Sequence, residues 1–393
     1  MKLLKKITAL LGAVAILLTF VGCHKKDEIA VTVNDVEFTA AYYMCAFIDA
    51  DSQAQQKVKE MAEEDSSIDT SKEGYYYSQK IDGKKYQEWV KDTAVEALKK
   101  IAAYKIKCKE NNVTINESNT TTVEQYAAYY WSYYGYSSLY EPNGVSFNTY
   151  REFMLDSYYT QEYFEFLYGK EGKNPVTEDE IKNFLSENYL IANVLYVDLS
   201  SLKGEAKTEK IEAVNGYAED IKAGKITFED AYYTENPTEK PTEEEETTDD
   251  KKEETSEDKK ENTSSDDQQD TSEDEKEDET KEPLDKWATL MGSKNTQESY
   301  QDEYYDRVKK MTVGEVVVVK EDDESAIALL IKGDIMADPY YLDAYDMTVR
   351  HDIKDEVYEK DMEDFAKTLK AEVNDYAVDR FKAKKIVYPS YSY

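Results

Sequence analysis

The sequence predicts an α+β fold, and three observations lead to that prediction. Residues 29–39 (IAVTVNDVEFT) alternate apolar and polar side chains, a pattern typical of a short strand. Apolar residues recur at helical spacing in long stretches, most clearly over Tyr86–Glu110. Residues 311–334 place two apolar runs around an acidic turn, which is typical of a β-hairpin. The 393 residues suffice for two or three domains.

The remaining elements follow along the chain. Thr39 can cap a helix that begins at residue 40, and residues 65–85 are polar enough to form a loop. Thr177 and Glu180 have the spacing of a capping box, which predicts another helix start. Residues 191–199 (IANVLYVDL) are typical of a buried strand. Further helices are expected over 205–222, 299–311 and, as one long charged region, 339–385, and residues 226–233 form either a short helix or a turn.

The first residues have the three parts of a secretory signal peptide, which we place at 1–22. Its apolar run ends Phe20-Val21-Gly22-Cys23, which resembles the lipobox of bacterial lipoproteins, with Phe20 in place of the usual Leu. The resemblance implies that Cys23 is acylated and that residues 23–28 form a tether. Two acyl chains hold a protein stably on a bilayer. We therefore expect a lipid-anchored protein on the extracytoplasmic face of a bacterial cell membrane; an ordinary signal peptide with an incidental Cys is the alternative.

Charge and composition exclude several classes of function. The net charge is −35, and removal of the three signal lysines makes it −38. Such a chain repels nucleic acid, so basic polypeptide segments are the better partners. The only histidines are His24 and His351, and the sequence predicts no metal site and no cofactor. Cys45 and Cys108 fall on apolar helix faces, where they form either a disulfide or two small buried hydrophobes.

Tyrosine is the unusual component of this chain, which contains 35 of them. Two stretches, 123–140 and 146–169, are especially rich in tyrosine. Either the rings form the core of slender helices, or they line a groove that binds exposed segments of other proteins. The sequence leaves both interpretations open.

Residues 238–282 form an acidic low-complexity insert. They contain 22 Asp or Glu and 7 Lys, a net charge of −15, and no aromatic or aliphatic residue. Nothing in the insert can offset the entropy of ordering, so we expect a disordered spacer.

The order of these elements resembles the PrsA/SurA-type foldases, which are extracytoplasmic folding helpers. The resemblance implies a mainly helical SurA-N-like chaperone domain (29–190) and a small parvulin-like peptidyl-prolyl isomerase domain with an antiparallel sheet and flanking helices (191–334). The insert at 238–282 interrupts the second domain, and 335–393 return to the first. The matching pieces are Val31–Thr39, Val176–Val197, Gly216–Ala231 and Met311–Asp334.

The catalytic residues of parvulins are not carried over. Asn193 and Ala328 occupy the positions where that family has histidine, and its glycine-rich segment is missing. Proline isomerisation needs an apolar pocket that stabilises a twisted amide rather than covalent chemistry. We therefore expect weak or absent isomerase activity. If the resemblance holds, residues 191–334 form a four-stranded antiparallel sheet with an apolar cleft beside Asn193 and Ala328.

The leading functional hypothesis is a membrane-anchored folding factor that binds unfolded or newly secreted polypeptides. One alternative is the solute-binding lipoprotein of a transporter, although the alternating βαβ pattern of two lobes is missing. The other is a structural surface lipoprotein that carries an isomerase-like relic domain.

Overall fold

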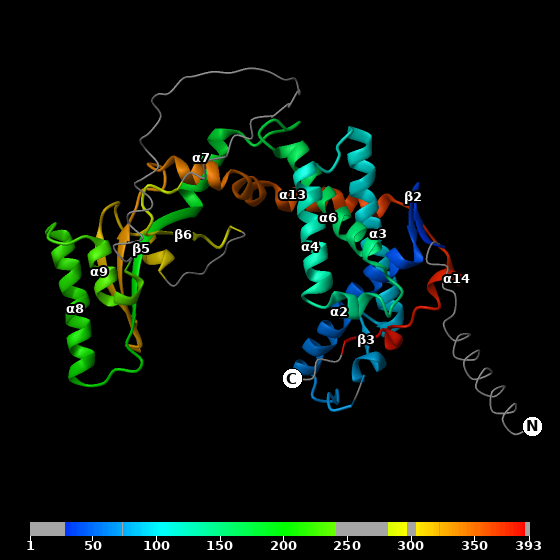
Figure 1. Cartoon of the computed structure of the whole chain (residues 1–393), viewed down its shortest axis with the longest axis horizontal. Helices are drawn as coiled ribbons and strands as arrows, with labels where there is room; N and C mark the ends of the chain where they lie inside the picture. The colour runs from blue at the N-terminus through cyan, green and yellow to red at the C-terminus, as the bar shows by residue number, and fades with distance from the viewer. Residues whose placement is uncertain (1–27, 73, 241–281, 297–303, 322, 390–393) are drawn as a thin grey trace, which may run out of the picture. The chain divides into compact units, whose positions relative to one another are not determined.

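A computed structural model describes residues 28–72, 74–240, 282–296, 304–321 and 323–389 (Figure 1). The expected signal peptide, Cys23 and nearly all of the acidic insert lie outside these residues. The fold is α+β with small antiparallel sheets, as the sequence predicts. Among the described residues, no helix is both long and apolar enough to cross a membrane.

The chain divides into two compact units. Unit 1 comprises Met1–Pro175 and Lys354–Tyr393, and unit 2 comprises Val176–Ile353. The first boundary therefore precedes the capping-box helix instead of following it at residue 190. The second boundary falls inside a helix, at 353/354, whereas the expected return to the first domain began at 335.

Unit 1 combines long helices with a small sheet. The sheet has the order β2-β1-β9, formed by Ile29–Val33 (β1), Val36–Thr39 (β2) and Ala371–Val373 (β9). Val31 pairs with Val373, so the two ends of the described chain meet in one antiparallel ladder. The expected helix over 339–385 is wrong in its extent, because α13 (Asp346–Thr368) ends before β9. The main helices are α2 (Ala40–Glu64), α3 (Tyr86–Asn111), α4 (Glu117–Ser132), α5 (Tyr136–Tyr140) and α6 (Phe147–Tyr168).

Local signals set the ends of these helices. The Thr39 hydroxyl accepts a hydrogen bond from the backbone N–H of Tyr42 (3.2 Å) at the start of α2. Asn112 ends α3 in the left-handed conformation at φ 57°, which Asn tolerates better than most residues. The expected loop 65–85 contains short elements: η1 (Tyr75–Ser78) and the hairpin β3 (Lys80–Ile81) and β4 (Lys84–Lys85). After β9 come α14 (Asp375–Val378) and η3 (Ala383–Lys385).

Unit 2 is built on a four-stranded antiparallel sheet of order β6-β5-β8-β7. The strands are β5 (Tyr189–Asp198), β6 (Ala288–Gly292), β7 (Val316–Lys320) and β8 (Ala326–Lys332), so the predicted strand and hairpin are confirmed. The helices are α7 (Glu178–Asn188), α8 (Glu205–Lys222), α9 (Phe228–Glu235), η2 (Pro237–Glu239), α11 (Tyr305–Lys309) and α12 (Pro339–Ala344). The predicted capping box is confirmed. The side chains of Thr177 and Glu180 each accept a hydrogen bond from the backbone N–H of the other residue.

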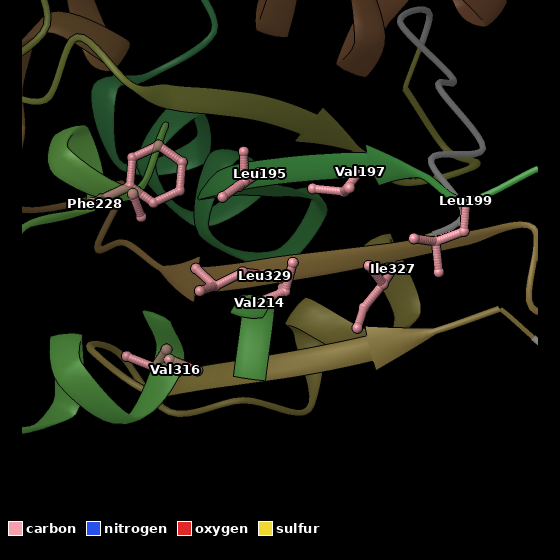
Figure 2. Packing of buried hydrophobic residues seen from close by; sticks show 10 residues of the cluster. Leu195, Val197, Leu199, Val214, Phe228, Val316, Ile327 and Leu329 are labelled. Atoms are coloured by element: carbon pink, nitrogen blue, oxygen red, sulfur yellow. The ribbon is translucent and has the colours of Figure 1, made fainter. Parts of the chain in front are cut away.

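Both faces of this sheet carry apolar clusters. On one face, Leu195, Val197, Ile327 and Leu329 pack against Val214 of α8 and Phe228 of α9 (Figure 2). On the other face, Ala192, Ala328 and Leu330 pack with Met291 and with Val308 of α11. A sheet that is apolar on both faces explains why β5 and β8 are nearly continuous apolar runs.

Candidate functional site

The strongest candidate site is a group of exposed rings on α4, on α5 and on the turn between them in unit 1, here named the tyrosine surface. It consists of Tyr126, Tyr129, Tyr130, Tyr133, Tyr134 and Tyr136. Residues 126, 129, 130 and 133 are three or four apart, so they share one side of the helix. All except the half-buried Tyr130 are exposed, from 38% for Tyr136 to 74% for Tyr133. Large exposed aromatic groups of this kind mark binding surfaces.

The tyrosine surface is held by the opposite side of α4. Val123 and Ala127 are fully buried there, where α4 packs on α6. The start of α4 is fixed by Asn116, whose side chain accepts a 2.7 Å hydrogen bond from the backbone N–H of Asn119. The buried carboxylate of Glu162 on α6 accepts hydrogen bonds from Asn116 N–H and Asn119 Nδ2, both at 2.9 Å. These bonds position the helix that presents the rings.

The exposed rings contact each other in a regular arrangement. Tyr129 and Tyr133 stack with centroids 5.0 Å apart and planes at 9°. Tyr134 meets both rings edge-on, at 5.3 Å from Tyr129 and 5.4 Å from Tyr133. Stacked and edge-to-face pairs are the favoured geometries of aromatic rings, so the tyrosine surface is preorganised.

The ring network continues inward from the surface. Tyr130 stacks on Tyr136 (5.7 Å), and Tyr136 meets the buried Tyr150 edge-on (5.9 Å). Tyr150 contacts Tyr140 at 4.8 Å. Burial raises the pKa of Tyr140 and of Tyr150, and the charge of Asp49 on α2 raises both further. Burial in turn raises the pKa of Asp49 to about 6.

Neither interpretation of the tyrosine-rich stretches holds for all of them. The rings of α4 are largely exposed, whereas Tyr150, Tyr163 and Phe164 of α6 are buried. In the sequence, the spacing of residues 126, 129, 130 and 133 indicates that these four tyrosines share one side of a helix. Only the packing of α4 on α6 determines that this side faces solvent. The sequence does not single out Asp49, which lies on α2.

The two positions matched to parvulin histidines do not face each other. Asn193 pairs with Ile331, whereas Ala328 pairs with Tyr196. Since Asn193 and Tyr196 are three residues apart on one strand, their side chains point to opposite faces of the sheet. Asn193 lies on the face of Leu195 and Val197, and Ala328 is fully buried in the cluster beneath α11. The structure therefore does not bring these two positions together as one pocket.

The remaining candidate residues do not assemble into a site. Cys45 and Cys108 are free and buried, so the disulfide expected as one alternative is not formed. Their thiols donate to the carbonyl oxygens of Ala41 (3.7 Å) and Tyr159 (3.6 Å). Cys23 and His24 lie outside the described residues. Within the described residues, no group of His, Cys, Asp and Glu could hold a metal ion.

Two hollows of unit 1 share Val113 and Thr114, and charged side chains take part in the lining of both. The first has Asp35, Lys105 and Lys109 on its wall, and Lys109 pairs there with Asp35 (3.0 Å). Such a lining differs from the apolar cleft that proline isomerisation needs.

No family model matches this chain, and no curated protein matches it significantly.

Proposed function

We propose that this protein is a membrane-anchored extracytoplasmic folding factor that holds unfolded or newly secreted polypeptides, with weak or absent peptidyl-prolyl isomerase activity. The observation that carries the proposal is the exposed tyrosine surface. Tyrosine offers a large rigid contact area at a small loss of side-chain entropy, and its hydroxyl keeps the ring compatible with water. A surface of this kind can bind many sequences without being apolar enough to aggregate.

The architecture of each unit supports the foldase resemblance. Unit 2 contains a four-stranded antiparallel sheet, with α8 and α9 between its first two strands in the chain. In unit 1, the pairing of β1 with β9 supports the inference that the last part of the chain completes the first domain. On these grounds we assign unit 1 to a SurA-N-like chaperone domain and unit 2 to a parvulin-like domain.

The expectation of little isomerase activity rests on the sheet of unit 2. Neither matched position carries an imidazole, and the side chains of Asn193 and Ala328 point to opposite faces. Hydrogen-bonding groups that stabilise a twisted amide must converge on one point, which two faces of a sheet cannot provide. Binding of clients by unit 1 does not require that pocket.

The proposed location follows from acylation of Cys23. Two lipid chains would keep the mature protein on the outer leaflet, where secreted polypeptides emerge. A Cys23→Ser chain should lose metabolic labelling by fatty acid and leave the membrane fraction. Labelling that persists in the Cys23→Ser chain would contradict this assignment.

Light scattering tests the holding function. The mature chain with Cys23→Ser should slow the aggregation of a chemically unfolded secreted protein. The variant Y129S/Y133S/Y134S should lose most of this effect while its urea midpoint stays the same, because exposed side chains contribute little to stability. Tyr376→Ser is the matched control, since Tyr376 is 80% exposed and lies on α14, outside the tyrosine surface. Aggregation that is equally fast with and without the chain would contradict the proposal and leave the structural-lipoprotein alternative.

A further inference from the structure

The tyrosine surface lies in a segment without positive charge. From Glu117 to Glu141 the chain contains three glutamates and no lysine or arginine. One of these glutamates, Glu124, pairs with Arg151 of α6 at 3.1 Å. The whole chain carries a net charge of −35. A ligand of the tyrosine surface therefore meets aromatic faces in a negative field, which attracts cations.

A second negative group lies at the inner end of the same ring network. The rings lead from Tyr136 through Tyr150 to Tyr140, and the charge of Asp49 contributes to raising the pKa of the last two. In the described part of the chain, no cation pairs with Asp49. Burial raises the pKa of its carboxyl group. The aromatic network is therefore negative at its inner end as well as along α4.

Arginine is the side chain whose chemistry matches these features. Its guanidinium group is planar, always charged and weakly hydrated, so it stacks on aromatic faces. Lysine has a compact and strongly hydrated charge, which makes it the poorer partner for a ring face. Unit 1 already contains such a contact, with Arg380 of the loop after α14 lying 5.9 Å from the ring centroid of Tyr376.

We propose that the tyrosine surface selects client segments by their arginine residues, which stack on its rings within the negative field of α4 and Asp49. This inference rests on the proposed holding function and names the class of segment that is held. Tyr133 is the expected first contact because it is the most exposed ring of the surface. Its stacking partner Tyr129 and the edge-on Tyr134 hold that ring in place.

Peptide binding measured by fluorescence anisotropy tests the proposal on the full mature chain with Cys23→Ser. The probes are extended labelled peptides that differ only in one repeated side chain: arginine, lysine or citrulline. Citrulline keeps the planar shape of arginine and removes its charge. We expect the arginine peptide to bind most tightly, the lysine peptide several-fold more weakly and the citrulline peptide about tenfold more weakly, with the arginine preference reduced by salt.

Two triple variants separate ring stacking from apolar contact. Y129L/Y133L/Y134L keeps apolar bulk but removes the aromatic faces, and Y129S/Y133S/Y134S removes both. Both should lose the preference for arginine over citrulline, whereas Tyr376→Ser should keep it. Circular dichroism and urea midpoints establish that each variant is folded. If a variant fails to fold, the proposal is tested by the ratio of the affinities of the unsubstituted chain for the arginine and citrulline peptides.

Equal binding of the arginine and citrulline peptides overturns the proposal, and so does an unchanged preference in the leucine variant. Failure of the arginine proposal can be distinguished from failure of the proposed holding function. A chain that suppresses aggregation but shows no arginine preference keeps the holding function and loses only the selectivity. A chain that neither suppresses aggregation nor binds any peptide loses both.

Discussion

Asn193 and Ala328 lie on neighbouring antiparallel strands, yet their side chains point to opposite faces of the sheet. Asn193 shares its face with the cluster beneath α8 and α9, and Ala328 shares its face with the cluster around Val308 and Met311. Two histidines introduced at these positions would therefore not face each other as a pair.

The double substitution N193H/A328H should give no gain in proline isomerisation. Because Ala328 is fully buried, the larger imidazole should also lower the free energy of unfolding by about 1–3 kcal/mol. Isomerisation kinetics with a proline peptide and urea titration measure the two effects. Thr289→His, at an exposed position of β6, is the matched control and should leave stability unchanged. A clear rise in the isomerisation rate of the double variant would contradict the opposed orientation.

Asp49 should make unit 1 less stable as the pH rises. Burial raises the pKa of Asp49 to about 6 in the folded chain, above the ordinary value of about 3.9. The folded state therefore holds its proton more tightly, and stability falls as the pH rises from about 4 through 6. Asp49→Asn should stabilise the protein by up to about 3 kcal/mol at pH 7.5 and by little at pH 4.

Urea titration at the two pH values measures this difference. Glu64→Gln, at the exposed end of the same helix, should show no such pH-dependent gain. If Asp49→Asn raised the stability equally at both pH values, the pKa of Asp49 would not be raised by burial.

Tyr388 should stabilise unit 1 through the buried Asp51. Its hydroxyl donates a 2.6 Å hydrogen bond to Asp51 Oδ2, and Tyr86 donates one of 2.9 Å to Oδ1. Tyr388→Phe removes one donor from a fully buried carboxylate, so unfolding should become easier by about 1–3 kcal/mol. Tyr376→Phe serves as the control on an exposed ring. Equal urea midpoints for the two variants would argue against this hydrogen bond.

The thiols of Cys45 and Cys108 should be unreactive in the folded protein. Burial raises the pKa of Cys108 to about 12 and raises that of Cys45 well above its ordinary value, so little thiolate forms. In a Cys23→Ser chain, a thiol reagent should detect almost nothing under native conditions and two thiols in urea without reductant. Detection of no thiol in urea would show that a disulfide joins the two residues.

The sequence by itself determined the local structure. Thr39 as a helix cap, the capping box of Thr177 and Glu180, and the strand at 191–199 could all be read from it, and each is present. These features depend on hydrogen bonds and side-chain periodicity within a few residues, which a sequence displays directly. The α+β class followed from the same patterns.

Only the tertiary structure decided which residues share a site. The face on which Asn193 or Ala328 lies depends on the pairing register of β5 and β8, since a shift of one residue reverses every side chain. The exposure of Tyr129 and Tyr133, against the burial of Tyr150, depends on which side of α4 packs on α6. Both are contacts between residues far apart in the chain, and their energies come from packing that no local pattern contains.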